Sequence, residues 1–277
     1  MKKILFSVIL AFACQCALAQ SLSTSMLPGD ARSLSLGGIR TADKVEGIDV
    51  RASFGTWAPS SVNSTVFDLN LAYGKADIFA AGLELTNFKG RQYNITDESG
   101  CVSSTYSPSD IYFGAFGHLR VNGRFTAGAR VRCAVSDIGD NSSAFAIIGV
   151  FKGTYNYCGL DAGISFQAGS PVNYGNGYYS TPLVFKAEAS YSLKALTTMC
   201  ELGYEAVSRS VLGAVGAEYS LNEYLTARAG YHFGKVIPSF FSLGLGVSYR
   251  GLGLSAAYLL PGNNIGNSFL ITVSCCL

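Results

Sequence analysis

Two histidines, His118 and His232, are the side chains of this sequence that could act as a base near neutral pH. A hydrolase built into a barrel wall would also need a nucleophilic serine and an acid that orients the histidine. The sequence has no G-x-S-x-G motif, and no acidic residue is spaced to orient either histidine. We therefore predict a protein that is not an enzyme and that needs no cofactor. Lipid hydrolysis with His118 or His232 as the base is the third of three hypotheses.

The cysteines do not form a pattern that binds metal. Cys133, Cys158 and Cys200 each fall in phase with the apolar face of a predicted strand, which favours small apolar wall residues over disulfides. Cys275 and Cys276 are adjacent, so on a strand they point to opposite faces. Without a C-x-x-C pair, two histidines give no convincing zinc site.

The first residues have the order of a secretory signal peptide. Two lysines precede an apolar run at Ile4–Ala13, and the small residues of Ala17-Leu18-Ala19 follow. We predict cleavage between Ala19 and Gln20, which leaves 20–277 as one domain after a signal peptide at 1–19. A lipoprotein-type cut before Cys14 is the alternative.

The composition favours a membrane barrel. Charged residues make up 14% of the chain, against about 25% in a typical soluble domain. The sequence has 32 Gly, 17 Phe and 16 Tyr, which suits an apolar wall with aromatic rims. Loss of the two signal lysines leaves 18 basic residues, equal to the 18 acidic ones, so no basic surface for nucleic acid is expected. The long uncharged stretch 251–277 is interrupted by a turn-forming cluster at 261–267, so it is not a membrane helix.

Large apolar side chains alternate with Gly, Ser and charged residues along many segments, which is typical of strands with one apolar face. We predict an all-β fold, a transmembrane antiparallel barrel of about 14 strands, within a range of 12–16. A soluble exported sandwich also explains alternation; the signal peptide, the low charge and strands of about ten residues favour the barrel. Segment 143–151 is apolar on both faces and is not oriented. The clearest segments are 124–132, 182–193, 223–233 and 241–250, with weaker ones at 67–73, 79–86 and 159–166.

The other face of these strands carries charges of both signs, which we assign to the lumen. Mixed signs favour ion pairs that brace and close the lumen; a polar path or a binding site is the alternative, although a selective pore usually shows one dominant sign. The residues assigned to the lumen are Glu84, Arg124, Arg130, Arg132, Asp161, Lys186, Glu188, Glu201, Glu205, Glu218, Arg228, His232 and Arg250.

Both ends of the chain resemble a known family. The segment Ala31-Arg32-Ser33-Leu34-Ser35-Leu36-Gly37-Gly38 is similar to the opening of the PorV/PorQ proteins and their relatives, the FadL-type transporters. The segments Leu225–Tyr231, Phe241–Val247 and Gly251–Tyr258 are similar to the ending of that group. The resemblance covers about a third of the chain. It implies a 14-stranded barrel whose N-terminal segment, around Ala31–Thr41, plugs or braces the lumen.

The resemblance implies one of two roles, either in the protein secretion and surface attachment of the type IX pathway or in the transport of hydrophobic compounds. A Gram-negative outer membrane, its lipids and either secretion components or a hydrophobic ligand are then the expected surroundings. The second hypothesis is a structural or adhesive surface barrel that binds a partner through its loops, especially Lys89–Pro108 and Gln167–Thr181. The sequence departs from the family, because the Asn-Pro-Ala segment is replaced near Trp57-Ala58-Pro59-Ser60, the chain is shorter, and it ends in Leu277. No functional residue carries over by motif.

Overall fold

The computed structural model describes residues 22–40, 45–58, 64–75, 78–96, 101–139, 143–175, 177–260 and 266–277. Fourteen strands within these ranges form a closed antiparallel barrel, as predicted. The first strand pairs with the last, Asp49 lying opposite Cys276 and Thr56 opposite Phe269, so the sheet has no free edge. The predicted signal cleavage site at Ala19 and Gln20 lies outside the described residues.

The strands of the barrel are 8 to 15 residues long. They are β1 (Gly47–Trp57), β2 (Ser64–Lys75), β3 (Phe79–Gly90), β6 (Ser109–Arg120), β7 (Phe125–Asp137), β8 (Ser143–Tyr157), β9 (Leu160–Gly169), β12 (Val184–Leu193), β13 (Leu196–Glu205), β14 (Ser210–Ser220), β15 (Leu225–Phe233), β16 (Phe240–Tyr249), β17 (Leu252–Leu259) and β18 (Ser268–Cys276).

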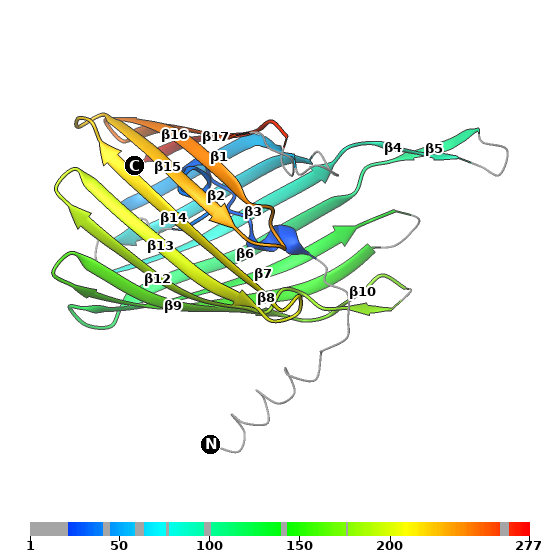
Figure 1. The fold of residues 1–277 in the computed structure, drawn as a ribbon, viewed down its shortest axis with the longest axis horizontal. Helices are drawn as coiled ribbons and strands as arrows, with labels where there is room; N and C mark the ends of the chain where they lie inside the picture. Colours follow the sequence, from blue (N-terminus) through cyan, green and yellow to red (C-terminus); the bar gives the residue numbers. More distant parts are fainter. Residues whose placement is uncertain are drawn as a thin grey trace, which may run out of the picture.

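The two ends of the barrel differ (Figure 1). Tight turns such as 194–195 and 250–251 join the strands at one end, which we call the short-turn end. At the opposite end, the loop end, two of the connections contain small hairpins. These are β4 (Tyr93–Thr96) with β5 (Val102–Tyr106), and β10 (Val172–Asn173) with β11 (Tyr178–Tyr179). Membrane barrels of bacteria have short turns on the periplasmic side and long loops on the outside. By this rule, we expect the loop end to face the cell surface.

The hairpins lie within Lys89–Pro108 and Gln167–Thr181, the two loops through which the second hypothesis has the barrel bind a partner. The β4–β5 hairpin extends beyond the barrel (Figure 1) and is held by Tyr106, whose hydroxyl donates to Asp137 Oδ1 at 3.1 Å. Burial and this carboxylate raise the pKa of Tyr106, so the hydroxyl keeps the proton that it donates. The β10 strand instead packs against β8 of the barrel: Val172 is fully buried, and Tyr174, which follows β10, donates to Ser136 Oγ at 2.9 Å.

The outer wall of the barrel is apolar along its whole circumference. Side chains such as Phe54, Leu83, Ile147, Leu202 and Leu243 are all half exposed on the outward face of their strands. A surface this apolar and this continuous requires an apolar medium such as the bilayer core. No helix of the described residues is long and apolar enough to span a membrane.

An N-terminal segment lies inside the barrel, as the resemblance implied. The lumen segment (residues 22–40) contains the 3-10 turn η1 (Ser23–Met26) and the short helix α2 (Ala31–Ser35). Asp30 caps α2, because its side chain accepts the Ser33 N–H at 2.8 Å. The helix packs against β15, β16, β17 and β18, so the segment lies against one wall of the lumen rather than along its axis.

Glycines on that wall let the backbone of the lumen segment come close. A Cβ atom on Gly230 of β15 would overlap the backbone nitrogen of Gly37 and approach Leu36 Cα at 2.8 Å. A Cβ on Gly216 of β14 would lie 2.9 Å from the carbonyl oxygen of Leu36. These contacts involve backbone atoms, which cannot rotate away, so the two positions need glycine for a steric reason.

Segment 143–151, which the sequence left without an orientation, is oriented in the barrel. Ala144, Ala146 and Ile148 point inward and are buried, whereas Phe145 and Ile147 point outward. The segment is apolar on both faces because its inner face lies at the loop end of the lumen, where the lumen is itself apolar.

Three residues were misplaced by the alternation. Cys158, expected in the wall, and Arg250, expected in the lumen, both lie in tight turns with positive φ and are exposed. Arg124, also expected in the lumen, precedes β7 and lies over the ring of Tyr157 at the short-turn rim. In each case the period of two stops where the chain leaves the strand, so the phase no longer predicts the face. The adjacent pair Cys275 and Cys276 does point to opposite faces, and Cys276 Sγ donates to Asp49 Oδ1 at 3.3 Å.

Candidate functional site in the barrel lumen

The lumen has two layers of different chemistry. The loop-end half is lined by inward-facing apolar side chains that form one buried cluster with the lumen segment. Trp57 and Phe240 meet edge to face with ring centroids 5.8 Å apart, and Phe88 and Tyr112 do the same at 6.3 Å. The lumen segment adds Leu22, Met26, Leu27 and Leu34 to this cluster.

Polar contacts fix the start of the lumen segment in this apolar layer. Thr24 Oγ1 donates to Asp110 Oδ2 at 2.7 Å and shares a hydrogen bond with Tyr112 Oη at 2.6 Å. The carbonyl oxygen of Ser25 accepts from Arg132 Nη1 at 3.3 Å. Ser25, Tyr112 and Arg132 are buried, so these bonds satisfy polar atoms that lie among apolar side chains.

On the short-turn side of this apolar layer lies a group of charged side chains centred on Glu84 of β3. Arg132 of β7 donates to both carboxylate oxygens of Glu84, at 2.6 and 3.1 Å, and Arg130 Nη1 lies 3.2 Å from Glu84 Oε2. Arg40 of the lumen segment lies close to both arginines and donates to the carbonyl oxygens of Ser25 and Leu27. Burial, together with Arg132 and Arg130, lowers the pKa of Arg40 to about 9. The lumen segment therefore brings a third guanidinium group to a single glutamate.

A second charged group ties α2 to the wall. Arg32 Nε lies 3.0 Å from Glu218 Oε2, and Arg228 Nε lies 2.6 Å from the same oxygen. Glu218 on β14 thus bridges an arginine of the lumen segment and an arginine of β15. One carboxylate shared by two guanidinium groups joins the lumen segment to the wall by charge-assisted hydrogen bonds.

Two further ion pairs lie on the wall formed by β8, β9, β12 and β13; the first reaches across β9 and the second joins two adjacent strands. Lys152 of β8 pairs with Glu188 of β12, and Lys186 of β12 pairs with Glu201 of β13 at 2.8 Å. Lys152 Nζ also approaches the carbonyl oxygen of Arg40 at 3.5 Å. Ion pairs therefore connect many of the inward-facing charges, as the bracing hypothesis expects. The lumen segment takes part in this network through Arg32 and Arg40.

The remaining predicted lumen residues have other surroundings. Asp161 accepts from Asn156 Nδ2 at 2.7 Å near the short-turn end. Glu205 is fully buried at the loop end of β13, where its carboxylate accepts the backbone N–H groups of Leu183, Val207 and Ser208. Its carboxylate therefore stabilises the turn between β13 and β14 and does not face the charged groups.

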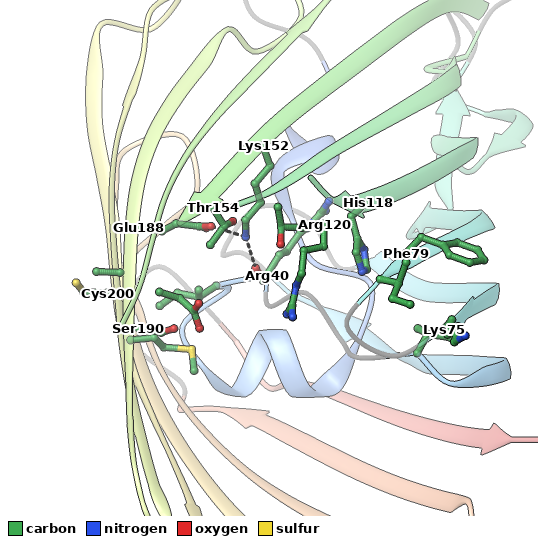
Figure 2. A pocket seen from close by; sticks show the side chains of 17 residues that line it. Arg40, Lys75, Phe79, His118, Arg120, Lys152, Thr154, Glu188, Ser190 and Cys200 are labelled. Carbon is green, nitrogen blue, oxygen red and sulfur yellow. Dashed lines mark hydrogen bonds and ion pairs between the residues drawn. The ribbon is translucent and has the colours of Figure 1, made fainter. Parts of the chain in front are cut away.

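The histidines do not form a catalytic pair in the described residues. His232 is 5% exposed and stacks on Phe240 with ring centroids 5.2 Å apart, and its Nε2 has no hydrogen-bond partner. His118, near the short-turn end of β6, lines a cavity there (Figure 2), whereas His232 lies near the loop end of β15. A histidine base needs a nucleophile within hydrogen-bond reach, which His232 lacks.

Two connected cavities remain beside the lumen segment. The inner cavity, of about 250 Å³, lies between the segment and the charged group around Glu84. The outer cavity, of about 220 Å³, lies at the short-turn end (Figure 2). Arg40, Val45, His118, Lys152 and Glu188 line both, so they form the boundary between the two.

Several residues of this site were not among the predicted ones. Arg32 and Arg40 lie outside any alternating segment, and only the family resemblance pointed to their position in the chain. Lys152 follows the segment that could not be oriented. Asp68 of β2 is buried and accepts from Thr86 Oγ1 at 2.6 Å; its phase on the strand was a signal that could have found it.

Comparisons with known proteins show the class to which this architecture belongs. The sequence matches no protein-family profile and no curated protein. The Ralstonia pickettii toluene transporter TbuX superposes with a TM-score of 0.68 at 12% identity, over 92% of this chain and 100% of that one. The monoaromatic hydrocarbon channel CymD gives 0.65 at 11% identity, over 88% and 96%. A Pseudomonas aeruginosa FadL homologue gives 0.56 at 11% identity, over 92% and 96%. The chain therefore has the fold of FadL-like outer-membrane barrels.

Proposed function

We propose that this protein is a non-catalytic outer-membrane channel of a Gram-negative bacterium that carries small hydrophobic compounds inward past its lumen segment. It reaches the membrane as the domain 20–277 after removal of the signal peptide 1–19. The observation that carries the proposal is the apolar loop-end layer of the lumen, where Trp57, Phe240, Phe88 and Tyr112 surround the lumen segment.

An apolar lumen half is not needed for a merely structural barrel. A braced barrel that carries water-soluble solutes would have a polar lumen throughout, as porins do. Here the half that faces the cell surface offers aromatic and aliphatic side chains, which recognise apolar molecules by burial of their surface. The transporters and channels of similar fold are described as carrying toluene and monoaromatic hydrocarbons, which makes these compounds the first substrates to test.

The lumen segment occupies this layer, so passage requires the segment to shift. Its apolar side chains Leu22, Met26 and Leu27 fill the space that an apolar ligand would take. A ligand can replace them at little cost, because it restores the same kind of contact. The cavities of about 250 and 220 Å³ beside the segment give the chain room to move.

A reversible lock tests the proposal. In a variant without the native cysteines, Ser25→Cys in the lumen segment and Gln167→Cys in β9 replace two side chains that are hydrogen-bonded, Gln167 Nε2 to Ser25 Oγ at 3.2 Å, so a short thiol-reactive cross-linker that dithiothreitol cleaves can join them. We expect cross-linked cells to take up radiolabelled toluene at the rate of cells without the barrel, and dithiothreitol to restore uptake. The single variants Ser25→Cys and Gln167→Cys, treated in the same way, are the matched controls. Uptake that is the same with the lock closed, or that does not depend on the barrel at all, would refute the proposal.

The second candidate function is the secretion or surface-attachment role of PorV/PorQ-type barrels. The feature that favours it is the β4–β5 hairpin, which projects beyond the barrel and carries exposed Tyr93 and Val102 (Figure 1). A variant that replaces 91–107 by a short Gly-Ser turn would lose surface-anchored cargo in a secretion assay and keep toluene uptake. If this variant keeps its surface-anchored cargo, the secretion role is excluded.

A further inference from the structure

Two polar side chains of β6 lie inside the apolar layer of the lumen. Asp110 and Tyr112 are two residues apart, so both point inward, and Tyr112 is fully buried. Asp110 Oδ1 accepts from Ser136 Oγ of β7 at 2.6 Å, and Ser136 Oγ accepts from the Tyr174 hydroxyl at 2.9 Å. The ring of Phe88 meets the ring of Tyr112 edge to face. These contacts hold the carboxylate and the phenol hydroxyl in place without help from the lumen segment.

Thr24 of the lumen segment joins these two groups. Its Oγ1 donates to Asp110 Oδ2 at 2.7 Å and lies 2.6 Å from Tyr112 Oη. A threonine hydroxyl has one proton, which goes to Asp110, so Tyr112 is the donor in the second bond. The wall therefore binds one hydroxyl group that donates once and accepts once, which any alcohol or phenol can do.

Displacement of the lumen segment, as transport requires, removes this hydroxyl. Thr24 then leaves together with Leu22 and Met26. In the part of the chain that the structure describes, Asp110 Oδ2 loses its donor and Tyr112 Oη loses its acceptor. A hydrocarbon restores the apolar contacts but neither hydrogen bond, and a polar group left unpaired among apolar side chains is unfavourable, above all a charged one. Sites that bind a hydroxyl group discriminate strongly against analogues that lack it.

We infer that Asp110 and Tyr112 form a hydroxyl-recognition site, and that the preferred ligand is a small apolar molecule with one hydroxyl group, such as a phenol. The ligand hydroxyl takes the place of Thr24 Oγ1: it donates to Asp110 Oδ2 and accepts from Tyr112 Oη. A phenol keeps its proton at neutral pH, as tyrosine does, so it can donate. The inference rests on the proposed function and narrows its substrate class.

Equilibrium dialysis of the full-length barrel in a neutral detergent tests the site, with protein-free detergent as the blank. The probes are radiolabelled p-cresol and p-xylene, which differ by a hydroxyl group in place of a methyl group. We expect p-cresol to bind the unaltered barrel more tightly, although p-xylene is the more apolar compound. Tighter binding of p-xylene would overturn the inference, and this comparison needs no variant to fold.

A double variant locates the discrimination. In Asp110→Asn/Tyr112→Phe the amide oxygen still accepts from Ser136, but an N–H donor replaces the acceptor Oδ2 and the phenol hydroxyl is gone. The ratio of p-cresol affinity to p-xylene affinity should fall about tenfold. The matched control is Asp137→Asn/Tyr106→Phe, which alters the carboxylate and hydroxyl pair of the β4–β5 hairpin and should leave the ratio unchanged. An unchanged ratio in the first variant, or an equal fall in both, would contradict the site.

Thr24→Val tests the competition between segment and ligand. The variant removes the hydroxyl that occupies the site and leaves Asp110 and Tyr112 intact, so both compounds should bind more tightly by the same factor. Unaltered affinities would mean that the ligand does not replace Thr24, which overturns the inference.

Uptake in cells separates this inference from the proposed function. If p-cresol keeps its preferred binding but cells with the barrel take up neither compound faster than cells without it, the transport role alone is refuted. If the barrel carries p-xylene and toluene but shows no preference for p-cresol in binding, the hydroxyl site alone is refuted.

Discussion

Arg32 in the lumen helix and Glu218 in β14 are joined by two contacts, Nε to Oε2 at 3.0 Å and Nη2 to Oε1 at 3.1 Å. Arg228 Nε donates to the same Oε2 at 2.6 Å, so the carboxylate lies between two guanidinium groups. Apolar packing and the close approach to the wall glycines position the lumen segment. Glu218 adds an ion pair with Arg32, whose strength depends on charge. The lumen segment is thus held both by packing and by an ion pair that a single substitution can break.

Replacing Glu218 by Gln should release this contact. The amide keeps the shape of the side chain but removes the negative charge that Arg32 and Arg228 share, which costs about 1–3 kcal/mol. We expect larger and more frequent openings in planar bilayer recordings than for the unaltered barrel. Glu223→Gln, in a turn at the short-turn end, is the matched control. Identical recordings for Glu218→Gln would mean that the pair does not hold the segment.

The glycine contact predicts a second way to displace the segment. In Gly230→Ala the new methyl group overlaps the backbone of Gly37, so the segment must move away from β15. Trypsin should then cleave after Arg40 or Arg32 at protease concentrations that leave the unaltered barrel intact. Gly128→Ala is the control, because its methyl group would face the lumen with its nearest neighbours 3.4 Å away and would not touch the segment. Equal resistance of the two variants would contradict the close approach.

The apolar outer wall predicts a position-dependent cost of charge. Leu243 on β16 is 50% exposed on the outward face, and Leu221 in the turn before β15 is 53% exposed. Leu243→Arg should destabilise the barrel folded in lipid vesicles by about 2–4 kcal/mol, whereas Leu221→Arg should have an effect near zero. Urea unfolding of both variants in the same vesicles measures the difference. A similar small effect at both sites would indicate that the wall is not immersed in lipid.

Two native cysteines report the direction of insertion. Cys101, before β5 at the loop end, and Cys158, in the turn between β8 and β9 at the short-turn end, are both exposed. In intact cells, a membrane-impermeant maleimide should label a variant that keeps only Cys101 and should not label one that keeps only Cys158. Permeabilising the outer membrane should make Cys158 reactive. The reverse pattern would place the β4–β5 hairpin in the periplasm.

The sequence by itself determined the barrel. A period of two over about ten residues assigns each side chain to one of two faces, and Glu84, Arg132, Glu188, Glu201 and Arg228 point inward because strand geometry leaves no third direction. The same rule explains where prediction stopped. Arg250 and Cys158 lie one residue beyond a strand, where φ is positive and alternation no longer applies.

Only the tertiary structure decided which charges meet and where the lumen is apolar. Glu84 lies on β3 and its partner Arg132 on β7, and their contact depends on the pairing of β3 with β6 and of β6 with β7. Arg32 reaches Glu218 across 186 positions of sequence, because the lumen segment folds back onto strands at the far end of the chain. Alternation carries no information about distance along the barrel axis or about what fills it. The division of the lumen into an apolar loop-end half and a charged half toward the short-turn end therefore follows from closure of the sheet around the segment.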